Sequence, residues 1–167
     1  MKFKKAEIKD IPQIMEIITA AQEYLKEQKI DQWQNNYPNP ESLKKDIQNK
    51  RSYLIKIDDK IAATAAIIFG NDPTYDYIED GEWLSSGDYG VIHRVAVAEN
   101  YKGQGIISEI FSQTYKLAAS KDISSIRIDT HPDNNAMQRA IAKEGFNYCG
   151  IIYTEAGSKR LAYEKLL

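Results

Sequence analysis

The alternation of hydrophobic and polar positions divides the chain into predicted strands and helices. Period-two alternation and short apolar runs predict strands, whereas apolar residues spaced three and four apart predict helices. The predicted strands cover residues 2–8, 52–57, 61–69, 89–98, 124–130, 146–153 and 159–166. The predicted helices cover residues 11–25, 40–49, 106–120 and 134–144. This order predicts an α/β (α+β) fold, in which about four helices flank a central, twisted, mixed sheet of about seven strands.

Capping residues mark the ends of three predicted helices. Asp10 precedes the first helix as its expected N-cap, and Asn39 followed by Pro40 opens the second. Asp133 stands where it can cap the fourth helix, and Gly145 can end that helix in a left-handed conformation. These residues support the boundaries that the hydrophobic pattern predicts.

Residues 95–108 combine an apolar strand, a polar turn with two glycines and the start of a helix. Gly103 and Gly105 separate the strand from the helical apolar face that begins at Ile106. Backbone N–H groups at a helix start have no intrahelical partner and lie at the positive end of the helix dipole. An anionic phosphate is favoured there, although glycines also follow strands simply because a tight turn needs positive φ. The segment is thus a candidate phosphate-binding turn.

Chain length and charge limit the domain count and the classes of partner. The chain has 167 residues, enough for one hydrophobic core, so we expect a single domain over residues 1–167. Its 22 Lys and Arg residues and 24 Asp and Glu residues give a net charge of -2. Because no basic block could follow a nucleic-acid backbone, nucleic acid is not expected as a partner.

The number of cysteines and the length of the apolar runs indicate the cellular compartment. Cys149 is the only cysteine, so it cannot form an internal disulfide, and with two histidines the chain has too few ligands for a structural zinc site. We therefore expect no metal. The basic start is not followed by an apolar segment, and no apolar run approaches the ~18 residues that span a bilayer. We expect an unexported, cytoplasmic protein that does not bind membranes.

Two motifs in this order resemble those of the GNAT superfamily of N-acetyltransferases. Residues 97–106 are similar to its acetyl-CoA motif, in which an Arg or Gln is followed by two arbitrary residues, a Gly, one arbitrary residue and a Gly or Ala. Residues 134–146 resemble the second signature, a helix headed by Asn and ending in Gly-Phe. The order of strands and helices matches the family over essentially the whole chain. The resemblance implies a GNAT-like fold with acetyl-CoA as the co-substrate.

The resemblance also implies which residues hold acetyl-CoA. Backbone groups of Val95 and Val97 would pair with the pantetheine arm as if it were an added strand. The turn and helix start would hold the pyrophosphate, and Asn134 would hydrogen-bond the coenzyme or simply cap its own helix. The implied set is Val95, Val97, Lys102, Gly103, Gln104, Gly105, Ile106, Ile107 and Asn134.

Three positions depart from the family pattern. Lys102 replaces the family's Arg or Gln, and a cation there still suits a pyrophosphate. Ile107 stands where the motif has Gly or Ala, so its side chain crowds a position where backbone usually approaches phosphate. Ile141 replaces the Tyr that often protonates the coenzyme thiolate. The departures at Ile107 and Ile141 leave open an alternative, a catalytically impaired acyl-CoA-binding sensor or interaction module.

Four side chains are candidates for proton transfer. His93 lies two residues before Val95 and is expected on the same strand face, and imidazole titrates near neutral pH, so His93 is the first candidate for the general base. A hydrogen-bonded structural histidine is the alternative. Glu82 is the rival base, acting through water. Tyr148 and Tyr153 could replace the missing acid, or could serve only in packing.

The acceptor site is expected between the loop that joins the first two helices and an acidic segment, residues 70–88. Trp33, Tyr37 and Trp83 could form aromatic walls, or could shield the core instead. The negative charge that would favour a cationic amine comes from Asp76, Glu79, Asp80 and Glu82. A polyamine, an amino sugar, a lysine or a peptide amine would all fit, and the sequence does not choose among them. Since dimers are common in the family, a homodimer stays open.

The motifs together favour one function over its rivals. We expect an N-acetyltransferase that moves acetyl from acetyl-CoA to a primary amine of a small molecule or peptide by direct attack. A Rossmann-type nucleotide enzyme is disfavoured because a strand and two helices precede the glycine turn. Cys149 has no spaced His and Asn or Asp set to activate it, so we expect a buried side chain rather than a nucleophile.

Overall fold

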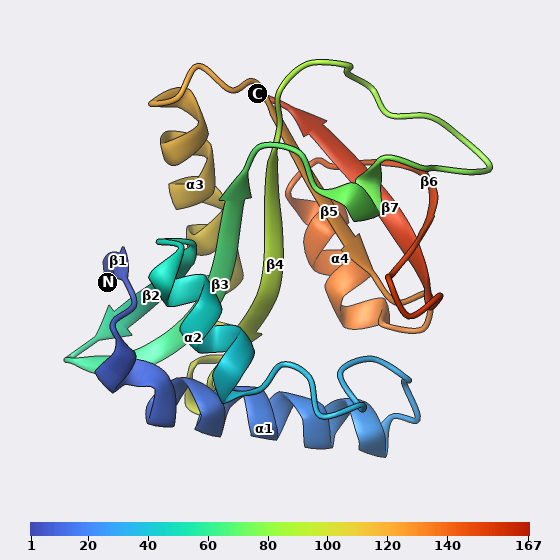
Figure 1. Cartoon of the computed structure of the whole chain (residues 1–167). Helices are drawn as coiled ribbons and strands as arrows, with labels where there is room; N and C mark the ends of the chain where they lie inside the picture. The colour runs from blue at the N-terminus through green and yellow to red at the C-terminus, as the bar shows by residue number, and fades with distance from the viewer. The chain divides into compact units, whose positions relative to one another are not determined.

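Seven strands of mixed direction form the sheet that the sequence predicts. The computed structural model describes residues 1–167, and its strands lie in the order β1-β2-β3-β4-β5-β7-β6 (Figure 1). The strands are β1 (Lys2–Lys5), β2 (Ser52–Ile57), β3 (Lys60–Phe69), β4 (Gly90–Val97), β5 (Ser125–Thr130), β6 (Asn147–Tyr153) and β7 (Lys159–Leu166). The helices are α1 (Ile11–Glu27), α2 (Pro40–Gln48), α3 (Ile106–Ala119) and α4 (Asn135–Lys143), with short 3-10 turns η1 (Ile8–Asp10), η2 (Pro73–Tyr75) and η3 (Glu99–Tyr101). The predicted fold class is confirmed.

Two compact units divide the chain. The first unit contains Met1–Ile67 and Arg94–Ile110, and the second contains Ile68–His93 and Phe111–Leu167. Both β3 and β4 contribute residues to each unit. The glycine turn therefore belongs to the first unit, and the acidic segment belongs to the second.

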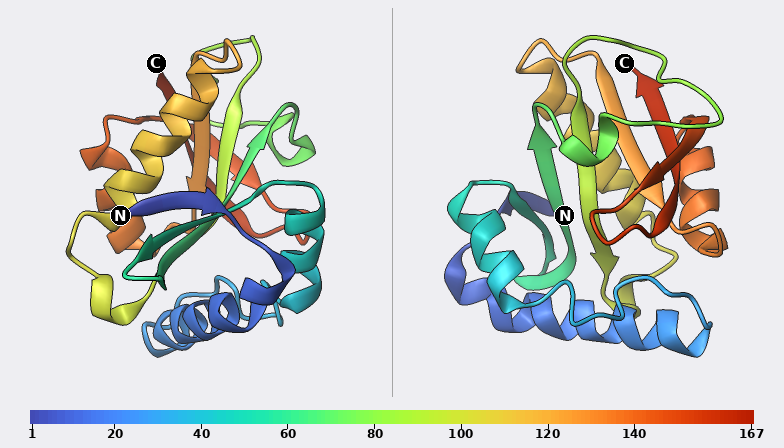
Figure 2. Two further views of the ribbon diagram at one scale, coloured as in Figure 1. Left: turned by 90° about the vertical axis from the view of Figure 1, so that its left-hand side faces the viewer. Right: turned by 45° about the vertical axis from the view of Figure 1, so that its right-hand side comes forward.

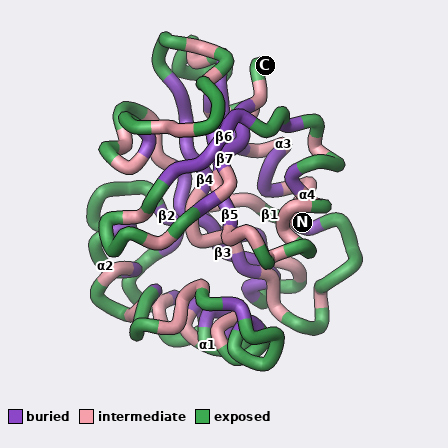
Figure 3. Tube along the Cα trace, turned by 90° about the vertical axis from the view of Figure 1, so that its right-hand side faces the viewer, coloured by how far each residue is buried: buried purple, intermediate pink, exposed green.

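In the first unit, one face of α1 is buried. Ile14 and Ile18 are fully buried, and the tube in Figure 3 alternates between buried and exposed along α1. Such a stripe follows from apolar residues spaced three and four apart, since those positions share one side of a helix. The buried cluster is Ala6, Ile14, Ile17, Ile18, Leu43, Leu54, Ile61 and Ala96. α1 also contacts α2, and α2 contacts β2.

The helix caps confirm two of the four capping predictions. Asn39 caps α2, because its Oδ1 accepts from the backbone N–H of Ser42 at 2.9 Å. Gly145 follows α4 with φ +79, the left-handed conformation expected of it. Asp10 stands at the N-cap position of α1, as expected, but its carboxylate makes no hydrogen bond to that helix; it accepts from the N–H of Glu7 and closes η1. The α4 prediction is shifted by one residue, as described below.

In the second unit, β5, β7 and β6 form consecutive antiparallel pairs. The hairpin of β6 and β7 is visible as two adjacent red strands in Figures 1 and 2. β4 and β5 are parallel, with Gly90 paired to Ile126 and Val91 to Arg127. His93 therefore follows the last paired residues of this ladder. A buried cluster of Tyr75, Tyr89, Val91, Ile152 and Ala162 lies in the same unit.

Candidate active site

The glycine turn has the backbone conformation that an anion-binding turn requires. Gly103 and Gly105 adopt φ values of +74° and +76°, which favour glycine over residues with a Cβ. No atom lies within 4 Å of where a Cβ would stand at either glycine, so conformation rather than crowding requires glycine here. The turn leads directly into α3, whose first residue Ile106 is buried while Ile107 is half-buried.

Side chains beside the turn make contacts with other residues of the first unit. The ammonium of Lys102 pairs with Glu99 at 2.5 Å and lies 5.0 Å from the centroid of the Tyr24 ring. The amide of Gln104 donates to the carbonyl of Asn100 at 2.9 Å. The positive charge that the sequence assigned to phosphate binding is thus already matched by one exposed carboxylate.

Val95 and Val97 are half-buried on β4, but the strand is not regularly extended just before them. Arg94 adopts φ +53, in the left-handed region that residues with a Cβ rarely occupy. Side chains two positions apart share a face only where the backbone is extended. The expected shared face of His93 and Val95 therefore does not follow from their spacing.

Asn134, rather than Asp133, caps α4. Its Oδ1 accepts from the N–H of Met137 at 3.1 Å, and α4 begins at the next residue, Asn135. This is the capping role that the sequence analysis set beside coenzyme binding. Ile141 is fully buried within α4, so the position of the family tyrosine presents no hydroxyl.

His93 belongs to a polar cluster in the second unit. Its Nε2 lies 2.7 Å from Oδ2 of Asp72, with 20% of the His93 side chain and 16% of the Asp72 side chain exposed. Burial would raise the pKa of Asp72, but the hydrogen bond and charge of His93 and the N–H of Thr74 lower it below its ordinary value. Asp72 is therefore a carboxylate at neutral pH, and a carboxylate can only accept hydrogen bonds. It follows that Nε2 of His93 carries the hydrogen.

A second carboxylate, from β5, completes this cluster. Oδ1 of Asp129 lies 4.0 Å from Nδ1 of His93 and accepts the phenol hydrogen of Tyr75 at 2.6 Å. The Tyr75 ring lies 5.9 Å from the imidazole, and the phenol of Tyr89 accepts from the N–H of Asp72 at 3.0 Å. The histidine is thus held by the loop carboxylate of Asp72 and lies near a strand carboxylate and a buried tyrosine.

A buried carboxylate fixes the acidic segment to β7. The N–H of Leu84 donates to Oε2 of Glu164 at 2.5 Å, and the hydroxyl of Ser85 also donates to this carboxylate. Ser125 and the Nε of Arg127 approach Oε1 at 2.5 Å and 3.3 Å. Burial would raise the pKa of Glu164, but hydrogen bonds from Ser125 and Ser85 and the charge of Arg127 lower it below its ordinary value. Glu164 is therefore an ionised anchor.

Trp83 is engaged in packing within the acidic segment. The guanidinium carbon of Arg127 lies 4.2 Å from the Trp83 ring centroid and 3.9 Å from that of Tyr89. The indole N–H donates to the carbonyl of Tyr75 at 3.0 Å. One face of the indole is thus covered by a cation, while the neighbouring Glu82 is exposed.

A close approach between its backbone and that of β6 fixes the acidic segment, residues 70–88, to this strand. Glu79 and Ile151 form an antiparallel bridge with N–H to carbonyl distances of 2.9 and 2.8 Å. A Cβ on Gly81 would stand 1.9 Å from the carbonyl oxygen of Cys149. Only glycine permits this approach. Cys149 is buried, as expected, and burial raises the pKa of its thiol.

The two candidate tyrosines are exposed on β6. Tyr153 donates to Oε1 of Glu79 at 2.5 Å, and this hydrogen bond raises the pKa of its phenol. Tyr77 donates to the other oxygen of Glu79 at 3.2 Å. Tyr148 stacks edge-on against Tyr163, with ring centroids 5.7 Å apart. A raised pKa makes the Tyr153 phenol a weaker proton donor than an ordinary tyrosine.

Arg94 connects the α1–α2 loop (residues 28–39) to an ion pair in the first unit. Arg94 donates to both carboxylate oxygens of Asp46, at 2.7 and 2.8 Å, and its third contact is the hydroxyl of Tyr37 at 2.7 Å. Trp33 packs against the buried cluster of this unit, whereas Tyr37 is exposed. Of the two aromatic candidates in this loop, Tyr37 has the more accessible ring.

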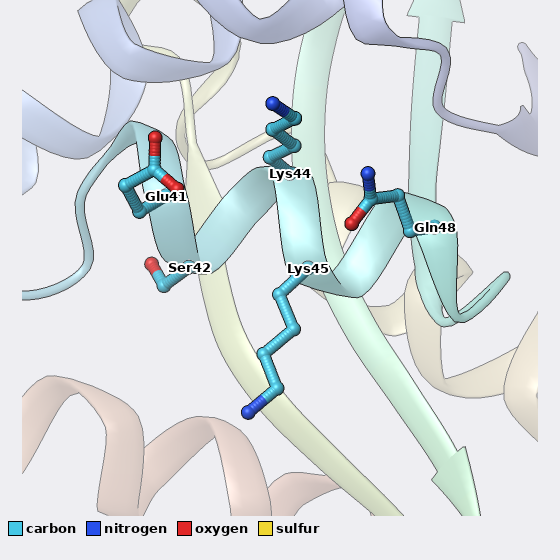
Figure 4. A pocket seen from close by; sticks show the side chains of 5 residues that line it. All are labelled: Glu41, Ser42, Lys44, Lys45 and Gln48. Atoms are coloured by element: carbon cyan, nitrogen blue, oxygen red, sulfur yellow. The ribbon is translucent and has the colours of Figure 1, made fainter.

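A shallow depression of about 460 Å³ lies over α2, lined by Glu41, Ser42, Lys44, Lys45 and Gln48. Figure 4 shows the side chains of Lys44 and Lys45 pointing away from each other, so their charges do not converge on a ligand. None of the predicted site residues lines this depression. It is therefore separate from the candidate active site.

Sequence reasoning did not single out Asp72, Tyr75, Asp129 or Arg94. Asp72 was visible only as one of several acidic residues between positions 70 and 88. Asp129 carried a stronger signal, since it follows the inward-facing Ile128 near the carboxyl end of a strand, where ligands often bind in α/β folds. Nothing in the pattern showed that these carboxylates approach the same histidine.

A mixed sheet of seven strands with a glycine turn leading into α3 is the arrangement expected of an acetyltransferase-like enzyme. Residues 14–146 match the Acetyltransferase (GNAT) family. The chain belongs to this family and is a GNAT-type acetyltransferase. No curated protein sequence matches the chain.

Solved structures support this assignment. A GNAT-family acetyltransferase from Streptococcus agalactiae 2603 is 32% identical with a TM-score of 0.89, over 99% of this chain and 95% of that chain. A putative acetyltransferase from Staphylococcus aureus Mu50 is 24% identical with a TM-score of 0.74, over 99% of both chains, and shows the fold alone. A ribosomal-protein-alanine N-acetyltransferase from Brucella melitensis is 16% identical with a TM-score of 0.72, over all of both chains, and shows the fold alone.

Two further properties of the chain concern metals and membranes. No group of three or more His, Cys, Asp or Glu side chains is arranged to hold a metal ion. None of the helices has the length and apolar character needed to cross a membrane.

Proposed function

We propose that this chain transfers the acetyl group of acetyl-CoA to a primary amine by direct attack, with His93 as the general base. The observation that carries the proposal is the 2.7 Å pair between Nε2 of His93 and Oδ2 of Asp72, in a cluster that is still partly accessible. Asp72 accepts the Nε2 hydrogen and so leaves Nδ1 as the basic nitrogen. The imidazolium formed on proton uptake is stabilised by the same carboxylate.

The glycine turn fits the phosphate groups of acetyl-CoA. Gly103 and Gly105 have left-handed backbone and open space beside them, and the N-terminus of the 14-residue helix α3 follows. Backbone N–H groups of Gln104, Ile106 and Ile107, with that of Gly105, would bind the pyrophosphate, since a helix start favours an anion. Lys102 would add a cation beside them. When bound, acetyl-CoA supplies the acetyl group as an activated thioester.

Three groups from the sequence analysis retain supporting roles in the proposal. The backbone of Val95 and Val97 would pair with the pantetheine arm, and Asn134 would contact the coenzyme from the start of α4. Tyr153 is the weaker of the two candidate acids because its phenol already donates to Glu79. The phenol of Tyr148 makes no hydrogen bond that would compete with that role, but its ring packs on Tyr163.

The acceptor is proposed to be a small-molecule or peptide amine that carries positive charge. Asp76, Glu79, Asp80 and Glu82 would attract it, and Tyr37 would offer an aromatic surface. One structural neighbour is a ribosomal-protein-alanine N-acetyltransferase, which is a reason to include a peptide with N-terminal alanine among the acceptors tested.

Thiol release from acetyl-CoA, measured over a panel of amines, tests the proposal. The panel contains spermidine, glucosamine, Nα-acetyl-lysine amide and an alanyl tripeptide. We expect His93→Gln to lower kcat about 10²- to 10⁴-fold at neutral pH, because amine deprotonation loses its base. The loss should shrink at alkaline pH, where the free amine is already abundant. Acetyl-CoA binding should be unchanged.

Two results would contradict parts of this proposal. A larger loss in Glu82→Gln than in His93→Gln, over the same pH range, would make Glu82 the base. Tight acetyl-CoA binding without thiol release for any amine would favour the alternative function, an acyl-CoA-binding sensor or interaction module. That alternative draws its support from Ile107 and from the buried Ile141, which replaces the family tyrosine.

A further inference from the structure

The two ring nitrogens of His93 face two different carboxylates. Nε2 lies 2.7 Å from Asp72, whereas Nδ1 lies 4.0 Å from Oδ1 of Asp129. The first distance is a hydrogen bond, and the second is too long for one. Asp72 therefore holds the imidazole, and Asp129 stands across from the nitrogen that has to take up the proton.

Asp129 is fixed in this position by its neighbours. It pairs with Ala162 in the ladder between β5 and β7, and its Oδ1 accepts the phenol hydrogen of Tyr75. Burial, and then the charge of Asp129, raise the pKa of Tyr75 well above its ordinary value, so the phenol stays a donor. Oδ2 lies 3.9 Å from Nε of Arg160. With 15% of its side chain exposed, the carboxylate is oriented yet accessible.

We infer that Asp129 binds the acceptor amine as an ammonium ion and presents it to Nδ1 of His93. A primary ammonium has three N–H donors, so it can donate one hydrogen to Oδ1 and another to Nδ1. Two acceptors 4.0 Å apart can both lie about 2.8 Å from one nitrogen. The inference rests on the proposed function and adds the residue that recognises the substrate.

The proton transfer balances within this cluster. The N–H bond of the ammonium breaks, an Nδ1–H bond forms on His93, and the electron pair remains on the amine nitrogen as the lone pair needed for attack. The positive charge passes to the imidazole, where Asp72 stabilises it. Asp129 keeps a hydrogen bond from one of the two remaining N–H groups. The imidazolium later releases its proton to water.

This arrangement selects for amines that are charged at neutral pH. The charged and titratable groups around the imidazole are Asp72, Tyr75, Tyr89, Asp129 and Arg160. Two carboxylates outnumber one guanidinium, so the surroundings favour a cation. Aliphatic primary amines should therefore be preferred over aromatic amines, which are neutral at the same pH.

A pair of isomeric probes and a matched variant test the inference. Benzylamine is an ammonium ion at neutral pH, whereas its isomer p-toluidine is neutral. Asp129→Asn should raise the KM for benzylamine about 10- to 100-fold with kcat reduced by less than about threefold. The KM for p-toluidine should stay unchanged. Asp88→Asn, which removes the same charge from an exposed position in the acidic segment, should leave both KM values unchanged.

The outcomes separate this inference from the proposed function. Equal benzylamine KM in Asp129→Asn and Asp88→Asn overturns the inference, even if His93→Gln still abolishes turnover. Partial recovery of KM in Asp129→Glu supports a role of the charge and excludes simple misfolding. If the wild type acetylates no amine, the proposed function fails. The Asp129 inference is then tested by measuring benzylamine binding by calorimetry. Weaker binding to Asp129→Asn than to Asp88→Asn then supports the ammonium site, and equal binding overturns it.

Discussion

The acidic segment of the second unit and the α1–α2 loop of the first unit are anchored in different ways. The acidic segment is held by a fully buried carboxylate, Glu164, and by the close backbone approach of Gly81 to Cys149. The α1–α2 loop is held through side chains, by the contact of Arg94 with the exposed Tyr37 and by hydrogen bonds of Gln22 and Gln34 to backbone carbonyls. The acidic segment is thus anchored to buried groups, whereas the contact of the α1–α2 loop with Arg94 is made by the exposed Tyr37.

This contrast predicts two kinds of mutational effect. Breaking a buried ion pair leaves an uncompensated charge and costs more than losing a partly exposed hydrogen bond. Changes in the anchors of the acidic segment should therefore lower stability. Changes in the contact with the α1–α2 loop should act mainly on the acceptor KM.

The largest effect is expected from Glu164→Ala. The substitution leaves the buried Arg127 guanidinium and the hydroxyls of Ser85 and Ser125 without their shared acceptor. We expect the free energy of unfolding to fall by about 3–5 kcal/mol, measured by urea denaturation. Glu155→Ala, at an exposed position in the β6–β7 turn, is the control and should change it by less than about 0.5 kcal/mol. Equal stability of the two variants would contradict the contrast.

The same anchor predicts a pH dependence. The pKa of Glu164 lies below its ordinary value of 4.5 in the folded protein, so ionised Glu164 stabilises the fold above that pH. This stabilisation is lost as the pH falls through the lower, folded-state value. The difference in unfolding free energy between the wild type and Glu164→Gln should therefore narrow as the pH is lowered from 7 toward 3. A free-energy difference that widens as the pH falls would contradict a lowered pKa of Glu164 in the folded protein.

The next largest effect is expected from Gly81→Ala. The new methyl group would meet the carbonyl oxygen of Cys149 at 1.9 Å, and backbone cannot easily move aside. We expect a loss of about 1–3 kcal/mol in unfolding free energy, the usual range for overpacking. Gly87→Ala is the matched control, because no atom lies within 4 Å of its Cβ position. Similar melting temperatures for Gly81→Ala and Gly87→Ala would show that the backbone at residue 81 can move away from the Cys149 carbonyl.

Periodicity predicted the elements well because burial repeats with the geometry of each element. The predictions for Asp10 and Asp133 were less accurate because several polar side chains compete for the N–H groups at a helix start, and only the chain path decides which one bonds. The residues of the candidate active site were harder to predict from the sequence. His93 could be named from its residue type, but Asp129 reaches it only because β4 and β5 pair in a particular register. Trp83 likewise packs under a cation that lies 44 residues away in sequence, at Arg127.

A smaller effect on stability is expected from Arg94→Lys. Lysine keeps the positive charge beside Asp46 but cannot donate to both carboxylate oxygens and to Tyr37 together. We expect about 1–2 kcal/mol of lost stability, measured by urea denaturation, and a several-fold higher acceptor KM. Arg51→Lys, at an exposed site in the same unit, is the control and should change neither quantity.

The smallest and most selective effect is expected from Tyr37→Phe. The change removes only the hydroxyl that accepts from Arg94 at 2.7 Å and leaves the Arg94–Asp46 pair in place. Because the ring is exposed, the unfolding free energy should fall by less than about 1 kcal/mol. The freed loop should raise the acceptor KM while kcat and the KM for acetyl-CoA stay constant. A fall in kcat, with the acceptor KM unchanged, would instead connect this tyrosine to the chemical step and contradict the contrast between the α1–α2 loop and the acidic segment.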